Sequence, residues 1–150
     1  MIAYNEAQGG LSHMRYWLVK SEPDAFSWDQ QVANGIEPWT GVRNHTAKLN
    51  LKAMQKGDLA FFYHSNVGKE IVGVVEVVRE AYPDPTAEKG DWVSVDMKAV
   101  SPVPKPVSLT TIKAEPALTG IPLIRQSRLS VMEISPEHWK LLSRMGGWKR

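Results

Sequence analysis

The sequence predicts a mainly β fold of the α+β class: a small, partly open barrel of five to six strands with short helices at its ends. Segments rich in β-branched and aromatic residues recur along the chain and are separated by turn residues. The helical segments between them are short and do not alternate strictly with the strands, which argues against a doubly wound sheet. The 150 residues contain no repeat, low-complexity tract or linker, so we expect a single domain.

The N-terminal part of the predicted domain contains one strand and one short helix. Aromatic and β-branched residues predict the strand over 15–20 (RYWLVK). Ser27 stands three residues before Gln30, a spacing typical of a capping box, and this predicts a helix over 28–33. The proline and glycine content of 37–42 predicts a loop.

A second helix and a strand pair follow. Asn44 is suited to cap a helix over 45–54. The apolar run at 59–64 (LAFFYH) predicts a strand, and 70–80 predicts a longer one. The glycine-containing turn at 65–69 connects them, so we expect an antiparallel hairpin.

The middle of the chain is less regular. Alternating residues at 92–100 predict a strand with one buried face. A proline-rich loop is expected over 82–89, where Tyr82 either lids a pocket or packs on the barrel. We expect one helical turn over 108–113 and irregular apolar chain over 118–124. Between the strand predicted at 92–100 and the helical turn predicted at 108–113, three alternating prolines exclude a regular element: Pro102, Pro104 and Pro106.

The C-terminal part predicts a last strand over 128–134 and a helix that begins at Pro136, since proline is favoured at the first helical position. The buried face of that helix is expected to hold Trp139. Trp17 and Trp92, elsewhere in the chain, are also expected to be core or core-flanking residues. Trp148 follows a Gly-Gly pair, and we expect it to be mobile.

Composition limits the function classes. The chain has no cysteine and only four scattered histidines, so we predict no disulfide, no cysteine nucleophile and no metal site. A net charge of +2 permits nucleic-acid binding without arguing strongly for it. No apolar run is long enough to span a bilayer, and residues 1–13 lack the layout of a signal peptide, so we predict a cytoplasmic protein with a flexible tail at 1–13.

Six segments, in order, carry a family resemblance. They are 17–23 (WLVKSEP), 39–44 (WTGVRN), 57–65 (GDLAFFYHS), 71–75 (IVGVV), 81–85 (AYPDP) and 125–131 (RQSRLSV). The ordered set resembles the EVE domain, which places that domain at 14–147 and leaves 148–150 as a C-terminal tail. One departure is the absence of a proline near Glu133, which concerns the edge of the last strand.

The resemblance implies a PUA-like barrel related to YTH domains. Members of these families look like readers of modified bases, such as methylated or hydroxymethylated cytosine in DNA and N6-methyladenine in RNA. Neither catalysis nor a cofactor is implied, and the preferred base does not carry over.

Candidate pocket residues lie mainly at strand ends and in loops. Trp39 stands in a loop beside Gly41, where an indole is available for stacking on a planar ligand, although it could equally pin the loop to the barrel. Lys20 and Ser21 end a strand and offer polar groups to a base edge, with Ser21 as a turn cap the alternative. Trp28 either lines the pocket or staples its helix.

Two further stretches complete the predicted base pocket. Val42, Arg43 and Asn44 enter a helix N-terminus, which offers N–H donors and partial positive charge; plain capping by Asn44 and a solvated Arg43 are the alternatives. Tyr63, His64 and Ser65 close a strand at its turn, where Tyr63 is also a candidate core residue and His64 a candidate structural one.

Phosphate or backbone contacts are assigned to four residues. Arginine suits bidentate contact with phosphate, and Ser130 adds a hydroxyl. A charged, solvated strand edge is the alternative. The four are Arg43, Arg125, Arg128 and Ser130.

Together these observations predict a cofactor-free, non-catalytic binding module, favoured as a monomer, that holds a modified base of DNA or RNA in an aromatic pocket. One alternative is a small-molecule or protein-interaction module on the same barrel. The other is a hydrolase or transferase that uses His64 as general base, for which the sequence shows no partner group.

Overall fold

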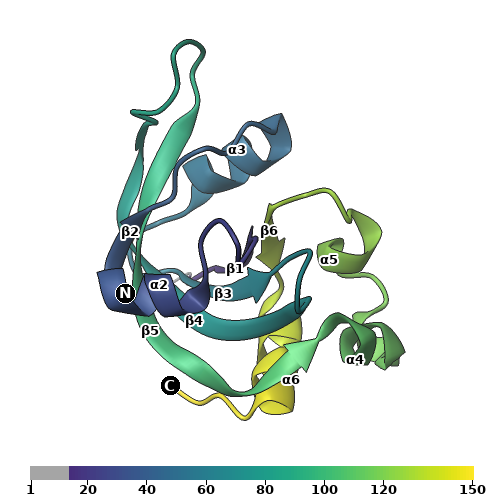
Figure 1. Ribbon diagram of the computed structural model, residues 1–150. Coiled ribbons are helices and arrows are strands. Elements are labelled where there is room, and N and C mark those ends of the chain that lie inside the picture. The colour runs from purple at the N-terminus through teal and green to yellow at the C-terminus, as the bar shows by residue number, and fades with distance from the viewer. Residues whose placement is uncertain (1–13) are drawn as a thin grey trace, which may run out of the picture.

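The computed structural model of the chain describes residues 14–150, and its centre is a single six-stranded sheet (Figure 1). The strand order is β2-β5-β4-β3-β1-β6. Neighbours run antiparallel except β1 and β3, which run parallel. The strands are β1 (Tyr16–Ser21), β2 (Ile36–Pro38), β3 (Leu59–His64), β4 (Glu70–Pro83), β5 (Val93–Ser108) and β6 (Val131–Ile134).

The sheet curls without closing, because β2 and β6 lie at opposite ends of the strand order and do not pair within residues 14–150. This is the partly open, mainly β barrel that the sequence predicts. Short helices cover its ends and flanks: α2 (Trp28–Asn34), α3 (His45–Ala53), α4 (Leu109–Ala114), a 3₁₀ turn η1 (Pro116–Leu118), α5 (Pro122–Arg125) and α6 (Pro136–Gly146). The predicted tail at 1–13 lies outside the described residues.

Local signals place several helices correctly. The Ser27 side chain accepts from the Gln30 amide, and the Gln30 side chain accepts from the Ser27 amide, so the predicted capping box is confirmed. The Asn44 side chain accepts from the Ala47 amide at 2.9 Å and starts α3. These contacts are short in sequence, which is why the sequence reveals them.

Strand β3 separates two aromatic clusters. On one face Phe61 stacks on Trp139 with ring centroids 3.9 Å apart, and Tyr16 stacks on the same indole. On the other face Phe62 contacts Trp28 and Trp39 edge to face. Because β-strand side chains alternate between faces, adjacent phenylalanines serve different clusters. The second cluster positions the functional site.

The three alternating prolines do not end β5, so the expectation of no regular element there is wrong. Pro102, Pro104 and Pro106 all lie within β5, which pairs with β4 on one side. On its other side β5 pairs with β2 only through 96–98. The β4–β5 register shifts between Ile71 and Gly73, and positions 103–106 of β5 have no ladder partner in β4. Pro104 and Pro106 therefore remove no N–H group that the ladder uses.

Other sequence-based expectations also need correction. Tyr82 lies in β4, which extends to Pro83, rather than in a loop. The predicted loop at 37–42 begins inside β2, and the segment expected to be irregular at 118–124 contains most of α5. Trp92 is only half-buried and packs on His45 with ring centroids 4.9 Å apart, so it flanks the core.

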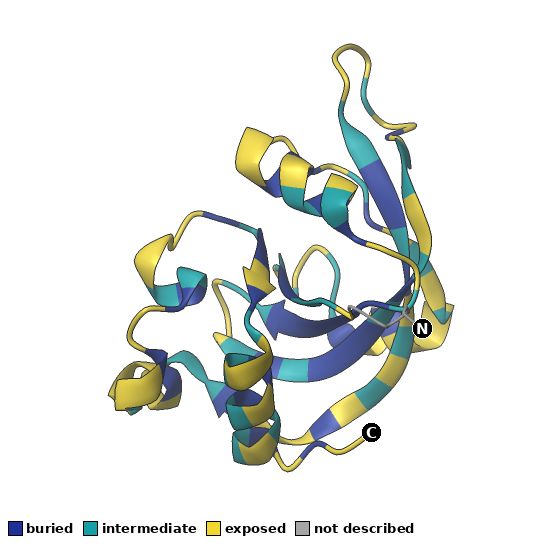
Figure 2. Cartoon of the chain, turned by 180° about the vertical axis from the view of Figure 1, so that it is seen from behind, coloured by how far each residue is buried: buried dark blue, intermediate teal, exposed yellow. Residues whose placement is uncertain are grey.

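Trp148 is buried rather than mobile. Its indole Nε1 donates to the Ser101 hydroxyl at 2.6 Å, and its ring lies edge to face against Trp139. Burial otherwise follows the sheet, whereas the tip of the β4–β5 hairpin is exposed (Figure 2). Among the helices of residues 14–150, none has both the length and the apolar character needed to cross a bilayer.

Candidate binding pocket

A cavity of about 810 Å³ opens where β1 ends, between the segment that leads into α3 and the segment that leads into β6. Its volume lies in the range of small-molecule sites, about 300–1,000 Å³. Residues distant in the sequence form its wall: Lys20, Ser21, Glu22, Ala25, Phe26, Glu37, Pro38, Trp39, Thr40, Gly41, Val42, Arg43, Asn44, Ser65, Ser127, Arg128 and Ser130.

Most of the residues predicted for the site line this cavity. From the predicted base pocket, the lining contains Lys20, Ser21, Trp39, Val42, Asn44 and Ser65. From the predicted phosphate contacts it contains Arg43, Arg128 and Ser130. The topology explains this convergence, because the parallel pair β1 and β3 brings Ser21 beside His64, and the Ser65 amide donates to the Ser21 carbonyl at 2.9 Å.

Trp28, Tyr63 and Arg125 lie outside the lining. Trp28 covers Gly73 on β4, so close that a Cβ at Gly73 would stand 2.5 Å from the indole. Tyr63 is buried on the opposite face of β3 from Phe62. The Arg125 guanidinium donates to the Thr119 carbonyl at 3.2 Å, which holds the turn before α5.

His64 is also outside the lining, and it holds helix α2. Its Nε2 accepts a hydrogen bond from the Trp28 backbone amide at 3.0 Å, and Trp28 is the first residue of α2. Burial lowers the pKa of His64, while the charges of Glu70 and Asp29 act in the opposite direction. The neutral imidazole therefore serves as an acceptor for an otherwise unpaired helix N–H group.

Trp39 forms the aromatic part of the cavity wall. Its indole is 8% exposed and lies edge to face with Phe62 and Phe26, with ring centroids 5.7 and 6.2 Å apart. Its backbone amide donates to the Val95 carbonyl at 2.7 Å, so the ring is anchored to β5. Phe26, which also lines the cavity, was not predicted from the sequence.

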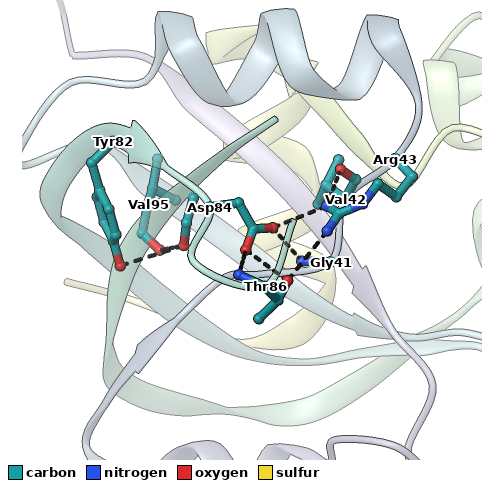
Figure 3. Close-up of polar contacts among 8 residues, drawn as sticks. Gly41, Val42, Arg43, Tyr82, Asp84, Thr86 and Val95 are labelled. Carbon is teal, nitrogen blue, oxygen red and sulfur yellow. Dashed lines mark hydrogen bonds and ion pairs between the residues drawn. The ribbon is translucent and has the colours of Figure 1, made fainter. Parts of the chain in front are cut away.

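A buried carboxylate fixes the segment that follows Trp39 (Figure 3). Asp84 accepts from the Gly41 amide at 2.8 Å and from the Arg43 guanidinium at 3.0 Å. The amide and hydroxyl of Thr86 each donate to the other oxygen at 2.7 Å. Burial by itself would raise the pKa of Asp84, but hydrogen bonds from Thr86, Gly41 and Arg43 outweigh it and hold that pKa well below its ordinary value.

This network changes the role of Arg43. Its guanidinium also donates to the Val42 carbonyl and the Thr86 hydroxyl. The charge is paired with a fully buried carboxylate, so Arg43 braces the wall of the cavity rather than presenting a free cation. Gly41 has φ +83°, a conformation that glycine adopts without strain, and this lets its amide reach Asp84.

Three polar side chains of the wall are partly committed to structure. The Ser21 hydroxyl donates to the Phe26 carbonyl, which fulfils the turn role that was the alternative for it. The Lys20 ammonium donates to the Ser127 carbonyl at 2.8 Å, and burial lowers the pKa of Lys20. Asn44 uses its carbonyl oxygen to cap α3, and its amide nitrogen makes no hydrogen bond within residues 14–150.

Sequence reasoning missed Phe26, Thr40, Ser127 and Asp84. Asp84 lies in the segment 81–85, which belongs to the family pattern. Its partners Gly41 and Arg43 are more than forty residues away in the sequence, so the pairing cannot be read from neighbouring residues. An isolated aspartate between two prolines was the available signal. Within the described residues, no cluster of three or more His, Asp or Glu side chains could hold a metal ion.

The open barrel and its aromatic, polar-rimmed cavity define a ligand-binding domain. Comparison with known proteins then identifies the family: the EVE domain model matches residues 15–145, and the chain belongs to the EVE domain family. It is 33% identical to mouse thymocyte nuclear protein 1 over 168 aligned positions, which cover 89% of this chain and 74% of the relative.

Solved structures of other proteins share the fold of this chain. Protein Rpa0253 from Rhodopseudomonas palustris is 59% identical with a TM-score of 0.85, over 89% of this chain and 94% of that one. The human THYN1 protein, solved in complex with 5-methylcytosine-containing DNA, is 29% identical with a TM-score of 0.82, over 91% and 99% of the two chains. A YTH domain from Zygosaccharomyces rouxii, 18% identical with a TM-score of 0.58, shares the fold.

Proposed function

We propose that this chain is a non-catalytic reader of nucleic acid that holds one modified base, such as 5-methylcytosine, in the cavity beside Trp39. The observation that carries the proposal is the cavity itself: an aromatic wall of Trp39 and Phe26 with polar groups at its rim. The human THYN1 protein, with the same fold, was solved in complex with 5-methylcytosine-containing DNA, which supports this class of ligand.

The wall supplies the interactions a base requires. Stacking on an aromatic side chain contributes about 1–3 kcal/mol per base. The unpaired amide of Asn44 and the Ser130 hydroxyl, which both line the cavity, are suited to a base edge. Burying one methyl group adds only about 0.8 kcal/mol, so discrimination must also come from matched hydrogen bonds and water exclusion.

The substrate must present its base outside a stacked duplex. Extruding a base costs a few kcal/mol, and this cost is smallest for single-stranded or mismatched positions. We therefore expect single strands to bind more tightly than the same sequence in a duplex.

The geometry of His64 supports a binding role over the hydrolase or transferase alternative. A general base needs a free lone pair within reach of the substrate. The Nε2 of His64 instead accepts from the Trp28 amide, and the residue does not line the cavity.

A binding screen tests the proposal. Single-stranded oligonucleotides that differ only in one central base, unmodified or modified, are titrated at a fixed, stated salt concentration because phosphate contacts are screened. We expect at least one modified base to bind about tenfold more tightly than its unmodified parent, a preference that hydrogen-bond matching can supply. Equal affinity for all bases would contradict base recognition.

Trp39→Ala locates the site. Losing one stacking partner should lower affinity by about tenfold or more. Trp28→Ala is the matched control, since Trp28 is equally buried and also packs on Phe62 but lies outside the cavity. Loss of affinity in both variants, with both folded by circular dichroism, would contradict the placement of the base beside Trp39.

A further inference from the structure

A second, smaller groove of about 300 Å³ adjoins the pocket. The two share Asn44, Ser127 and Arg128, so they are continuous. The groove lies between the start of α3 and the segment that connects α5 to β6, and its remaining lining residues are Thr46, Gln126 and Leu129. Its walls are mostly polar, and none of them belongs to the aromatic cluster around Trp39.

Two cations of the pocket wall, Lys20 and Arg128, have no carboxylate partner within residues 14–150, and both stand at this junction. Arg43 is paired with Asp84, and the Lys20 ammonium is bonded to the Ser127 carbonyl. Arg128 is exposed and forms no ion pair with any residue of 14–150. A guanidinium in this state is available for a phosphate.

Acidic residues line the pocket but not the second groove. Glu22 and Glu37 both belong to the pocket lining. A polyanion is repelled near these two carboxylates and attracted at Arg128, and such asymmetry selects a path across a surface.

We propose that the nucleic-acid strand leaves the pocket through this second groove, with the phosphate next to the bound base on Arg128 and the following nucleotide along Thr46 and Gln126. The inference rests on the proposed base-binding function and adds the route of the polymer and the residues that hold it. The free modified nucleoside, which has no phosphate, does not use the groove.

The test is Thr46→Glu, which places a negative charge in the groove. Thr46 is exposed at the second position of α3, where an acidic side chain is compatible with the helix dipole, so the fold should be retained. Thr110→Glu is the matched control, because Thr110 is exposed at the second position of α4, and both views place α4 far from α3 (Figures 1 and 2).

Two probes separate the proposals. One is a single-stranded DNA of about twelve nucleotides with one central 5-methylcytosine, a length within the site sizes of single-strand binders. The other is the nucleoside 5-methyl-2′-deoxycytidine. Each is titrated against wild type, Thr46→Glu, Thr110→Glu, Arg128→Ala and Trp39→Ala at several salt concentrations.

We expect Thr46→Glu to weaken binding of the oligonucleotide about fivefold or more at low salt while nucleoside binding is unchanged. Thr110→Glu should match wild type. Arg128→Ala should reduce the slope of log affinity against log salt by about 0.7, the value for one phosphate contact on a single strand.

If Thr46→Glu binds the oligonucleotide as tightly as wild type does, the route is overturned. In that case a loss of nucleoside binding in Trp39→Ala would still support the proposed function. Equal weakening of both probes by Thr46→Glu would also overturn the route, because the effect would then arise in the base pocket. If wild type binds neither probe, 5-methylcytosine is not the bound base and the route proposed for its strand is overturned, whereas the proposed function is decided by the screen of other modified bases.

Discussion

The carboxylate of Asp84 accepts a hydrogen bond from the Gly41 amide at 2.8 Å, and this contact joins the start of the loop between β4 and β5 to the wall of the binding pocket. Asp84 itself is anchored by its own amide, which donates to the Trp92 carbonyl at 2.9 Å. The pocket wall is therefore held by an element that does not line the pocket.

Asp84→Asn should loosen the pocket wall. The asparagine amide has one oxygen that can accept, and its NH₂ group would face the donors of either Thr86 or Gly41. We therefore expect the free energy of unfolding to fall by about 2–4 kcal/mol. We also expect affinity for a modified-base oligonucleotide to fall about tenfold, because binding must now order the segment at 39–44. Thermal unfolding and titration below the unfolding temperature measure the two effects.

Asp58→Asn is the matched control for that variant. Asp58 is also a buried carboxylate and accepts from the Trp17 indole at 3.0 Å and the Gln55 amide at 2.9 Å, but it does not line the pocket. It should lose stability while keeping wild-type affinity. If Asp58→Asn lost affinity to the same extent, the effect would be one of general destabilisation and the role of Asp84 in the pocket would be refuted.

Stability should depend on pH through His64. Burial lowers the pKa of His64, so the unfolded chain binds a proton more readily than the folded one. The stabilising contribution is present above the ordinary histidine pKa of about 6.5 and is lost as the pH falls below it. Protonation also removes the acceptor for the Trp28 amide, a hydrogen bond worth about 1 kcal/mol.

Urea unfolding of wild type between pH 8 and pH 5, about the range in which histidine changes charge, is the measurement. His64→Gln can still accept from the Trp28 amide but cannot titrate, so its unfolding midpoint should change less over this range. His138→Gln, on α6, should retain the wild-type profile. Identical profiles for wild type and His64→Gln would show that His64 does not carry the effect.

Gly73→Ala should destabilise the sheet. An added Cβ would stand 2.5 Å from the Trp28 ring, so the indole or the strand must shift. Such overpacking costs about 1–3 kcal/mol. Gly120→Ala is the control, since no atom lies within 4 Å of the added Cβ; it should stay within about 0.5 kcal/mol of wild type. Chemical unfolding that ranks the two variants equally would contradict the packing of Trp28 on Gly73.

The sequence predicts best what is decided by neighbouring residues. The strand at 59–64 and the caps at Ser27 and Asn44 depend on contacts a few residues long, and the structure agrees with them. The loop position of Trp39 beside Gly41 was sufficient to suggest its place in the cavity wall.

What the sequence did not predict depends on partners far along the chain. His64 finds the Trp28 amide, Arg43 finds Asp84, and Trp148 finds Ser101. Each pair forms only after the sheet brings its members together, so a polar or aromatic residue that looked free or mobile became structural. The prolines of β5 differ from expectation for a related reason, because their effect depends on whether the partner strand β4 uses an N–H group at those positions.

The prolines of β5 also limit the addition of a further strand to the sheet. Beyond the short pairing with β2, β5 offers no amide hydrogen at Pro102, Pro104 and Pro106. Strand addition needs alternating donors and acceptors, so a strand from a neighbouring chain could not continue a regular ladder along this part of β5.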